Sequence, residues 1–457
     1  MALTAPATAG AAETKLTAEN RSALALTVYS NDLAMISEER RASLPAGEAL
    51  LAIEDVSDRL RAETVLLGGA GVTLLEQSFV VDLLTPQRLL ESALGKTVSL
   101  IRTHPQTGED RVVEAEVLSL AGGVVLRVDG RIETTTPGRI AFAEIPAGLR
   151  SEPALLARLA VAEAGEKSLR LDYLTSGLSW RADYVARLNA AEDRMDLSAL
   201  VTLTNATRSD YRDAALRLVA GDVNQTNAVP LSQPKFRNEM VAMSAPADAI
   251  APPQSASDRY VYPVNRPVTL LRGETKQVPL MSAEGVAVKR EYRFDGLANG
   301  NARSGEIGPV SADLVLEIEN AEALGLGAPL PAGVVRIYGP GPGNAPLFLG
   351  EDFLAQTPEG EKARLRMGSA FDVTARARST EFERLSNRSY ETAQAITVKN
   401  AKDQPVEVLV GGSMPQGWTM LEETQPHEEE TVNRIVWRLQ VPAGGETELR
   451  YRVRVSN

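Results

Sequence analysis

Residues 175–188 read TSGLSWRADYVARL and contain one of only three tryptophans in the 457-residue chain. Side chains two residues apart on a β-strand share a face. The alternation therefore places Trp180 and Tyr184 on one face, with small residues between them, and Arg181 and Asp183 on the other. Large and small apolar residues that alternate in this way are typical of a core face, so the stretch predicts a central strand of a β-sandwich.

The same stretch supports a second interpretation, in which aromatic rings on one strand face form a platform for a ligand. Trp180 and Tyr184 would carry that platform, and Tyr338 and Trp418 are two further candidates for an exposed aromatic contact. The two interpretations differ in whether the rings are buried or exposed.

Alternation with a period of two extends from this stretch over most of the chain. Residues 23–84 and 166–385 predict a discontinuous central β-sandwich region. Residues 386–457 contain evenly spaced strands and turns and predict a C-terminal Ig-like sandwich. The predicted fold class is therefore mainly β, a multidomain β-sandwich protein.

Residues 85–150 interrupt this pattern. Thr85 is a suitable N-cap and Pro86 a suitable first helical residue, so a short helix is predicted after Thr85. Residues 96–146 then show a series of short strands separated by Gly, Asp-Gly and Pro turns. We expect a small SH3-like β-barrel inserted into the larger sandwich.

Three further segments have other patterns. Residues 151–165 predict a second short helix, because Ser151 can cap its start and Gly165 can end it. Residues 226–258 are rich in Pro, Ala and Ser without periodicity, and predict a flexible linker within the central region. Residues 1–22 begin with small residues suited to signal-peptidase cleavage, and predict a signal-peptide remnant or a disordered tail. The first alternative implies a periplasmic or secreted protein, and the second a cytoplasmic one.

Composition argues against several classes of function. The formal net charge of −12 disfavours binding to nucleic acid or to an anionic membrane surface, since both need a basic face. The absence of cysteine excludes disulfides, cysteine nucleophiles and Cys-ligated metals. The two histidines, His104 and His427, leave little material for imidazole catalysis or transition-metal sites. No stretch approaches the roughly 20 apolar residues of a transmembrane helix.

A search for catalytic motifs finds none with the required context. The S-x-x-K at Ser232 and Lys235 lies within the predicted linker, and no P-loop, G-x-S-x-G elbow or calcium loop is present. Acidic clusters are frequent, but a sequence cannot show whether two carboxylates face each other across a cleft. We therefore predict no catalytic residue, no cofactor and no metal site.

An ordered series of segments resembles the DUF4139 family of bacterial proteins, which includes mucoidy-inhibitor-like proteins that pair this domain with an N-terminal DUF4140 region. The matching segments are GLSWRADYVARL (177–188), LVTLTNATRSDYRDAALRLVAGDVN (200–224), PVTLLRGETKQVPL (267–280), LPAGVVRIY (330–338), LGEDFLAQTPEGEKARLRMGSAFDV (349–373) and VPAGGETELRYRVRV (441–455). The resemblance covers most of residues 24–457, although the coiled-coil segment of the mucoidy-inhibitor-like members is absent. Because the family's function is unknown, the resemblance implies a fold and no reaction.

Three hypotheses on function remain from the sequence. The first is a non-enzymatic cell-envelope protein, periplasmic and acting as a binding or scaffolding module, whose exposed strand edges bind a protein or another envelope component. The alternative is a carbohydrate-binding protein or a carboxylate-based hydrolytic enzyme that uses an inter-domain cleft. A third is assembly through the N-terminal region or the linker.

Overall fold

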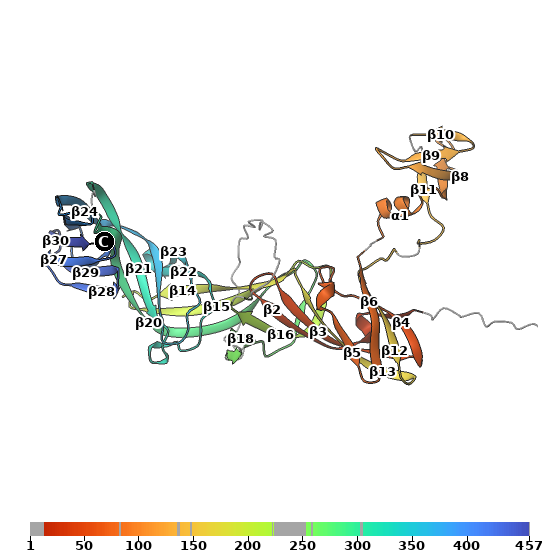
Figure 1. Cartoon of the computed structure of the whole chain (residues 1–457), viewed down its shortest axis with the longest axis horizontal. Helices are drawn as coiled ribbons and strands as arrows, with labels where there is room; N and C mark the ends of the chain where they lie inside the picture. Colours follow the sequence, from red (N-terminus) through yellow and green to blue (C-terminus); the bar gives the residue numbers. More distant parts are fainter. Residues whose placement is uncertain are drawn as a thin grey trace, which may run out of the picture. The chain divides into compact units, whose positions relative to one another are not determined.

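A computed structural model describes the fold of most of the chain. The described residues are 13–81, 84–134, 138–146, 149–221, 223, 253–256, 259–301 and 305–456. They are mainly β and form several sheets in a sandwich-like arrangement, which confirms the predicted fold class (Figure 1). Most of the predicted linker, residues 226–258, lies outside the described part, as do residues 1–12 of the predicted tail.

Backbone contacts divide the chain into two compact units. Unit 1 comprises Met1–Ser179, Thr204–Arg217 and Arg266–Thr275. Unit 2 comprises Trp180–Leu203, Leu218–Asn265 and Lys276–Asn457. Both units are therefore discontinuous in sequence.

The main sheet of unit 1 is built from strands that are far apart in sequence. In spatial order it contains β1 (Thr14–Leu16), β4 (Gly47–Glu54), β12 (Ala154–Val161), β6 (Val72–Val80), β5 (Leu66–Gly69), β13 (Gly165–Thr175), β3 (Ala34–Leu44), β2 (Arg21–Tyr29) and β16 (Tyr211–Ala220). The short β19 (Val268–Leu270) also pairs with β16. β1 runs parallel to β4, so the predicted tail over 1–22 is wrong for its last residues.

The prediction of a second helix over 151–165 is wrong, because this segment contains β12. Leu155, Ala157, Leu159 and Val161 are buried at every second position. β12 lies inside the sheet, with hydrogen-bonded partners in β4 and β6 on its two sides. The burial of this face between two neighbouring strands outweighs the helix propensity of Ala, Leu and Arg.

The inserted module has its own small sheet. It begins with the only α-helix among the described residues, α1 (Pro86–Ser92), in which the Thr85 hydroxyl accepts from the Arg88 N–H at 3.2 Å, as the capping signal predicts. Five strands follow: β7 (Thr97–Thr103), β8 (Asp110–Ser119), β9 (Val125–Val128), β10 (Arg131–Glu133) and β11 (Arg139–Ala141). Their core contains Leu100, Val117 and Leu126.

The predicted SH3-like barrel is not closed. The strand order is β10-β9-β8-β7-β11, which leaves β10 and β11 at opposite ends of the sheet (Figure 1). Each has only three residues, and no ladder joins them within the described part of the module. Closing a barrel needs continuous pairing around the whole sheet, and these end strands are too short to provide it.

Unit 2 is also built from strands, several of them long. Its strands are β14 (Leu178–Leu188), β15 (Arg194–Asn205), β17 (Gln254–Ala256), β18 (Arg259–Pro263), β20 (Thr275–Asn299), β21 (Ile307–Glu319), β22 (Gly333–Pro340), β23 (Pro346–Leu354), β24 (Lys362–Arg384), β25 (Ser389–Asn400), β26 (Val406–Ser413), β27 (Trp418–Glu423), β28 (His427–Thr431), β29 (Arg434–Val441) and β30 (Glu446–Ser456). The short 3-10 turns of the described residues are η1 (Ala18–Asn20) and η2 (Ala62–Thr64) in unit 1, and η3 (Glu322–Leu324) and η4 (Pro342–Asn344) in unit 2. The first residues of β14 and the last of β15 belong to unit 1.

The C-terminal block, residues 386–457, shares its core with earlier strands. β25 pairs with β24, and β26 runs parallel to β20. One buried cluster joins Trp437 and Val453 of the block to Phe294 of β20. Trp437 also stacks on Tyr451, with ring centroids 4.8 Å apart. The block therefore contributes to a core that continues into β20, β21 and β24.

The opening stretch forms β14, and its alternation predicts the buried face correctly. Trp180 is 3% exposed, and its Nε1–H donates to the Val219 carbonyl at 3.2 Å. Tyr184 is fully buried, and its hydroxyl donates to the Pro331 carbonyl at 2.7 Å. β22 approaches so closely that a Cβ on Gly333 would lie 2.2 Å from the Ala182 carbonyl oxygen.

Removing the buried groups of β14 is expected to destabilise unit 2. Trp180→Ala leaves a cavity and is expected to cost roughly 3–5 kcal/mol. Tyr184→Phe deletes one buried hydrogen bond and is expected to cost about 1 kcal/mol. Urea denaturation measures the free energy of unfolding of both variants, and calorimetry provides an independent value. Tyr29→Phe, at a partly exposed position, is the control. If Trp180→Ala is as stable as the wild type, the assignment of this ring to the core is wrong.

Candidate ligand-binding pocket

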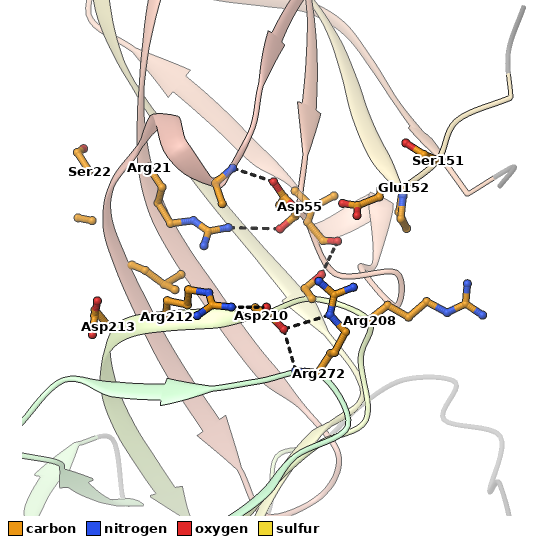
Figure 2. A pocket seen from close by; sticks show the side chains of 16 residues that line it. Arg21, Ser22, Asp55, Ser151, Glu152, Arg208, Asp210, Arg212, Asp213 and Arg272 are labelled. Atoms are coloured by element: carbon orange, nitrogen blue, oxygen red, sulfur yellow. Dashed lines mark hydrogen bonds and ion pairs between the residues drawn. The ribbon is translucent and has the colours of Figure 1, made fainter. Parts of the chain in front are cut away.

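Unit 1 contains a pocket of about 500 Å³ lined by polar and charged side chains (Figure 2). Six parts of the chain form it: η1, the start of β2, the segment after β4, the segment before β12, the loop into β16 with its first residues, and the turn after β19. Arginines and carboxylates from several of these parts face one another there.

Two aspartates shape the backbone around the pocket. Asp55 and Asp213 have φ values of 59° and 51°, in the left-handed region that aspartate tolerates better than most residues. Asp55 directly follows β4, and its Oδ2 accepts from the Ala18 N–H at 2.8 Å, which holds η1 against the end of that strand. Asp213 lies where the pairing of β16 with β19 is shifted in register, and its N–H donates to Thr269 Oγ1 at 3.1 Å.

Asp210 holds two arginines beside each other. Its Oδ1 accepts from the backbone N–H of Arg272 at 3.0 Å and from Arg272 Nε at 3.2 Å. Its Oδ2 accepts from Arg212 Nη2 at 2.9 Å. The pKa of Asp210 is held below its usual range, chiefly by the backbone N–H of Arg272 and then by the two guanidinium groups. Asp210 is therefore ionised at neutral pH and links the two arginines through its two oxygens.

Asp55 and Glu152 form a carboxyl pair on another wall of the pocket. The side-chain hydrogen bond between them is the largest cause of a raised pKa for Glu152, and burial adds to it. Arg272 opposes the shift. Ionising Glu152 beside Asp55 places two like charges together, so the Glu152 proton is held to a higher pH than is usual for glutamate.

A buried charge network supports the pocket from inside the sheet. Glu38 and Arg40, each 1% exposed, are joined by an ion pair of 2.9 Å. The other oxygen of Glu38 accepts from Arg21 Nε at 2.5 Å. Arg40 Nη1 donates to the carbonyls of Leu16 at 3.0 Å and Glu54 at 2.7 Å. One carboxylate thus fixes two guanidinium groups and connects β1, β2, β3 and β4.

Arg21 extends this network into the pocket wall. Its Nη2 donates to the Asp55 carbonyl at 3.3 Å, while its Nε remains on Glu38. Asp55 is also the partner of Glu152. The carboxyl pair is therefore connected, through Arg21, to the buried ion pairs of the sheet.

The aromatic residues proposed from the sequence lie in unit 2 and outside this pocket. Trp180 and Tyr184 are buried and expose no ring to a ligand. Tyr338 is half-buried and contacts the Phe348 ring edge-on, with centroids 5.5 Å apart. Trp418 is half-buried, and its Nε1–H donates to the Val432 carbonyl at 3.1 Å. A ligand-binding role for Tyr338 and Trp418 stays a prediction.

Sequence reasoning did not find the residues of the pocket. They come from segments that are distant in sequence, and none belongs to a known motif. The one local signal is SDYRD (209–213), which places Asp210 and Arg212 just before and within β16. The two histidines lie elsewhere: His104 Nδ1 accepts backbone N–H groups of its own turn, and His427 pairs with Glu423 at 2.9 Å.

Two other kinds of site are absent within the described ranges. No group of three or more His, Asp or Glu side chains there is arranged to hold a metal ion. Among the same residues, no helix has the length and hydrophobicity needed to cross a membrane.

The fold defines a mainly β protein of two units, with a charged pocket in the first. A family model described as a domain of unknown function (DUF4139) matches residues 169–457. The match covers more than half of the sequence, so the chain belongs to the DUF4139 family, which confirms the resemblance. A comparison with curated proteins finds no match.

The pocket combines residues from inside and outside the matched family region. Asp210, Arg212 and Arg272 lie within residues 169–457, whereas Asp55 and Glu152 precede them. The complete pocket therefore requires the segments that come before the matched domain.

Removing the shared carboxylate of the buried network is expected to be costly. Glu38→Ala leaves Arg40 buried without its counter-charge, which is expected to lower the free energy of unfolding by roughly 3–5 kcal/mol. Glu39→Ala, at the exposed neighbouring position, is the matched control and should change stability little. Thermal denaturation of both variants measures the difference. Equal effects would show that the buried network does not stabilise unit 1.

The carboxyl pair predicts a pH-dependent effect of Glu152→Gln. Because the pKa of Glu152 is raised in the folded chain, the stability linked to its proton is present below the usual glutamate range and lost as pH rises through the raised value. Gln keeps a donor to Asp55 at every pH. We expect equal stability near about pH 4 and a more stable variant near about pH 7, by less than about 1 kcal/mol because solvent screens the pair.

The control for this effect is Glu166→Gln, at an exposed position of β13. Thermal denaturation of the wild type and both variants across the same pH series measures it. A difference between Glu152→Gln and wild type that stays constant over the series would contradict a raised pKa for Glu152.

Proposed function

We propose that this protein is a non-enzymatic binding or scaffolding component of the bacterial cell envelope, and that the pocket of unit 1 is a ligand-binding site. The observation that carries the proposal is the mutual pairing of the pocket's charged groups. Asp210 with its two arginines, and Asp55 with Glu152, are held in place by their own hydrogen bonds. Groups fixed in this way lose little conformational entropy when a ligand binds.

The chemistry of the pocket supports binding more than catalysis. General acid–base catalysis works best with a group whose pKa lies near the working pH. Asp210 instead has a lowered pKa and is committed to two arginines, and both histidines of the chain are elsewhere. Arginines remain protonated at any physiological pH, so their role here is to attract and orient.

The proposed location in the periplasm or outside the cell is supported by the N-terminal sequence, whose small residues suit signal-peptidase cleavage. A scaffolding role is supported by strands at sheet ends. β27 is the last strand at one end of the main sheet of unit 2, where it pairs with β30. A protein partner can bind such an edge by adding a strand to it.

One observation favours a second candidate, a carboxylate-based hydrolytic enzyme. The Asp55 side chain raises the pKa of Glu152 in an open pocket, and such carboxyl pairs can act as acid and base. Glycosidases hold their two carboxyl groups about 5–9 Å apart, with room for water or sugar between them. The side-chain hydrogen bond to Asp55 that raises the pKa of Glu152 favours a closely paired arrangement over that spacing, and so favours binding.

In-cell crosslinking with mass spectrometry on fractionated cells tests the proposal. We expect the chain in the envelope fraction, crosslinked reproducibly to a protein or other envelope component. The matched variant is Glu152→Gln, which should keep these crosslinks if the pocket only binds. A cytosolic chain without crosslinks would contradict the binding proposal. Hydrolysis of an envelope glycan that Glu152→Gln abolishes would favour the enzyme instead.

A further inference from the structure

We infer that the pocket of unit 1 binds a small molecule through an oxyanion, a carboxylate or a phosphate, held between Arg212 and Arg272. The inference rests on the proposed binding function and names the ligand chemistry of the same pocket. The arrangement of Asp210 and its two arginines carries it (Figure 2).

The two guanidinium groups are held near each other with donors to spare. Arg272 uses its backbone N–H and Nε on Asp210, and Arg212 uses one Nη. Within the described part of the chain, these bonds leave both Nη groups of Arg272 and the second Nη of Arg212 for another acceptor. The two side chains are 60% and 66% exposed, so a ligand can reach them.

The charge immediately around Asp210 is suited to an anion. Asp210 supplies one negative charge to two guanidinium groups. The lining as a whole contains four arginines and four carboxylates, so this excess of positive charge is local to Arg212, Asp210 and Arg272. An oxyanion would neutralise it, and its two oxygens match the planar donors of arginine. The other arginines of the pocket are committed elsewhere: Arg21 donates to Glu38, and Arg208 lies 3.8 Å from Asp58. In Figure 2 the Arg208 side chain extends away from Asp210.

The carboxyl pair repels an anion less as pH falls, because the pKa of Glu152 is raised. The charged groups that act on Glu152 are Asp55, Arg272 and Glu54. Where Glu152 is protonated, the two side chains together carry about one negative charge instead of two, and present an O–H donor. Arg272 also feels the charges of both, so the pair and the arginines act on the same region of the pocket.

The size and lining of the pocket restrict the ligand further. A volume of about 500 Å³ lies within the usual range for small-molecule sites. None of the described residues that line it is aromatic, so stacking on a sugar ring is not its mode of recognition. A compact acid or a phosphorylated metabolite fits this description, and the anion would provide most of the specificity.

Isothermal titration calorimetry on the full chain tests the inference, with sodium phosphate and sodium succinate as separate probes in a low-salt buffer. We expect saturable binding of at least one probe, weakened by added sodium chloride. The probe that binds distinguishes a phosphate from a carboxylate ligand. Arg212→Gln and Arg272→Gln should each weaken binding about tenfold, as expected for loss of a charge-assisted hydrogen bond.

The matched control is Arg170→Gln. Arg170 pairs with Asp172 at 2.8 Å on β13 and is 64% exposed, so it resembles Arg212 with Asp210 but lies outside this pocket. It should leave the affinity unchanged. Binding of neither probe by wild type, or equal weakening in Arg170→Gln, would overturn the inference. If either pocket variant fails to fold, NMR of the wild-type chain provides the test. The probe should then shift arginine Nε–H signals, and unshifted signals would contradict the inference.

This outcome is separable from that of the proposed function. If the chain forms envelope crosslinks but binds neither anion, the proposed binding function stands and the inference of an oxyanion ligand is wrong. If the chain binds an anion but is cytosolic and forms no crosslinks, the inferred ligand chemistry stands and the proposed envelope role is wrong.

Discussion

The carboxylate of Glu38, buried between Arg21 and Arg40, is the interaction on which the architecture of unit 1 depends most. Removing charges from water is expensive, and a buried carboxylate is tolerated only when it is fully paired. Arg40 meets this demand by also binding the carbonyls of Leu16 and Glu54, which belong to different strands. The geometry of four strands is therefore tied to one charged group, because any displacement would leave a buried charge unpaired.

The same network determines how the pocket is held. Arg21 links Glu38 to the backbone of Asp55, and Asp55 pairs with Glu152 at the pocket surface. On the opposite wall, Asp210 organises Arg212 and Arg272 without help from the core. The pocket thus has one wall anchored in the sheet and one wall of exposed arginines, an arrangement suited to a ligand that enters from solvent. Only the second wall comes from the matched DUF4139 region.

Features set by neighbouring residues were predicted correctly from the sequence, and features set by contacts between distant segments were not. β14 was predictable because the alternation around Trp180 is local and agrees with its burial. Thr85 and Pro86 predicted α1 for the same reason. Residues 151–165 misled because their composition favours a helix locally, while two neighbouring strands impose an extended conformation. Closure of the inserted sheet depends on pairing between its two ends, which short strand patterns do not reveal.

The pocket was beyond sequence reasoning for a related reason. Asp55 and Glu152 gain their chemistry from each other, and the whole inserted module separates them in sequence. Arg272 gains its position from Asp210 across a segment that includes the predicted linker. A single sequence does not show which residues of such distant segments lie next to each other. Nothing therefore distinguished these charged residues from ordinary solvated ones.

The most direct test of the account is a crystal structure of the wild-type chain grown with sodium selenate, a tetrahedral oxyanion that anomalous scattering can locate. The account predicts an anomalous peak within hydrogen-bonding distance of both Arg212 and Arg272, on the side opposite Asp210. Selenate bound elsewhere on the protein, with the Arg212–Arg272 position empty at full saturation of the other sites, would contradict it.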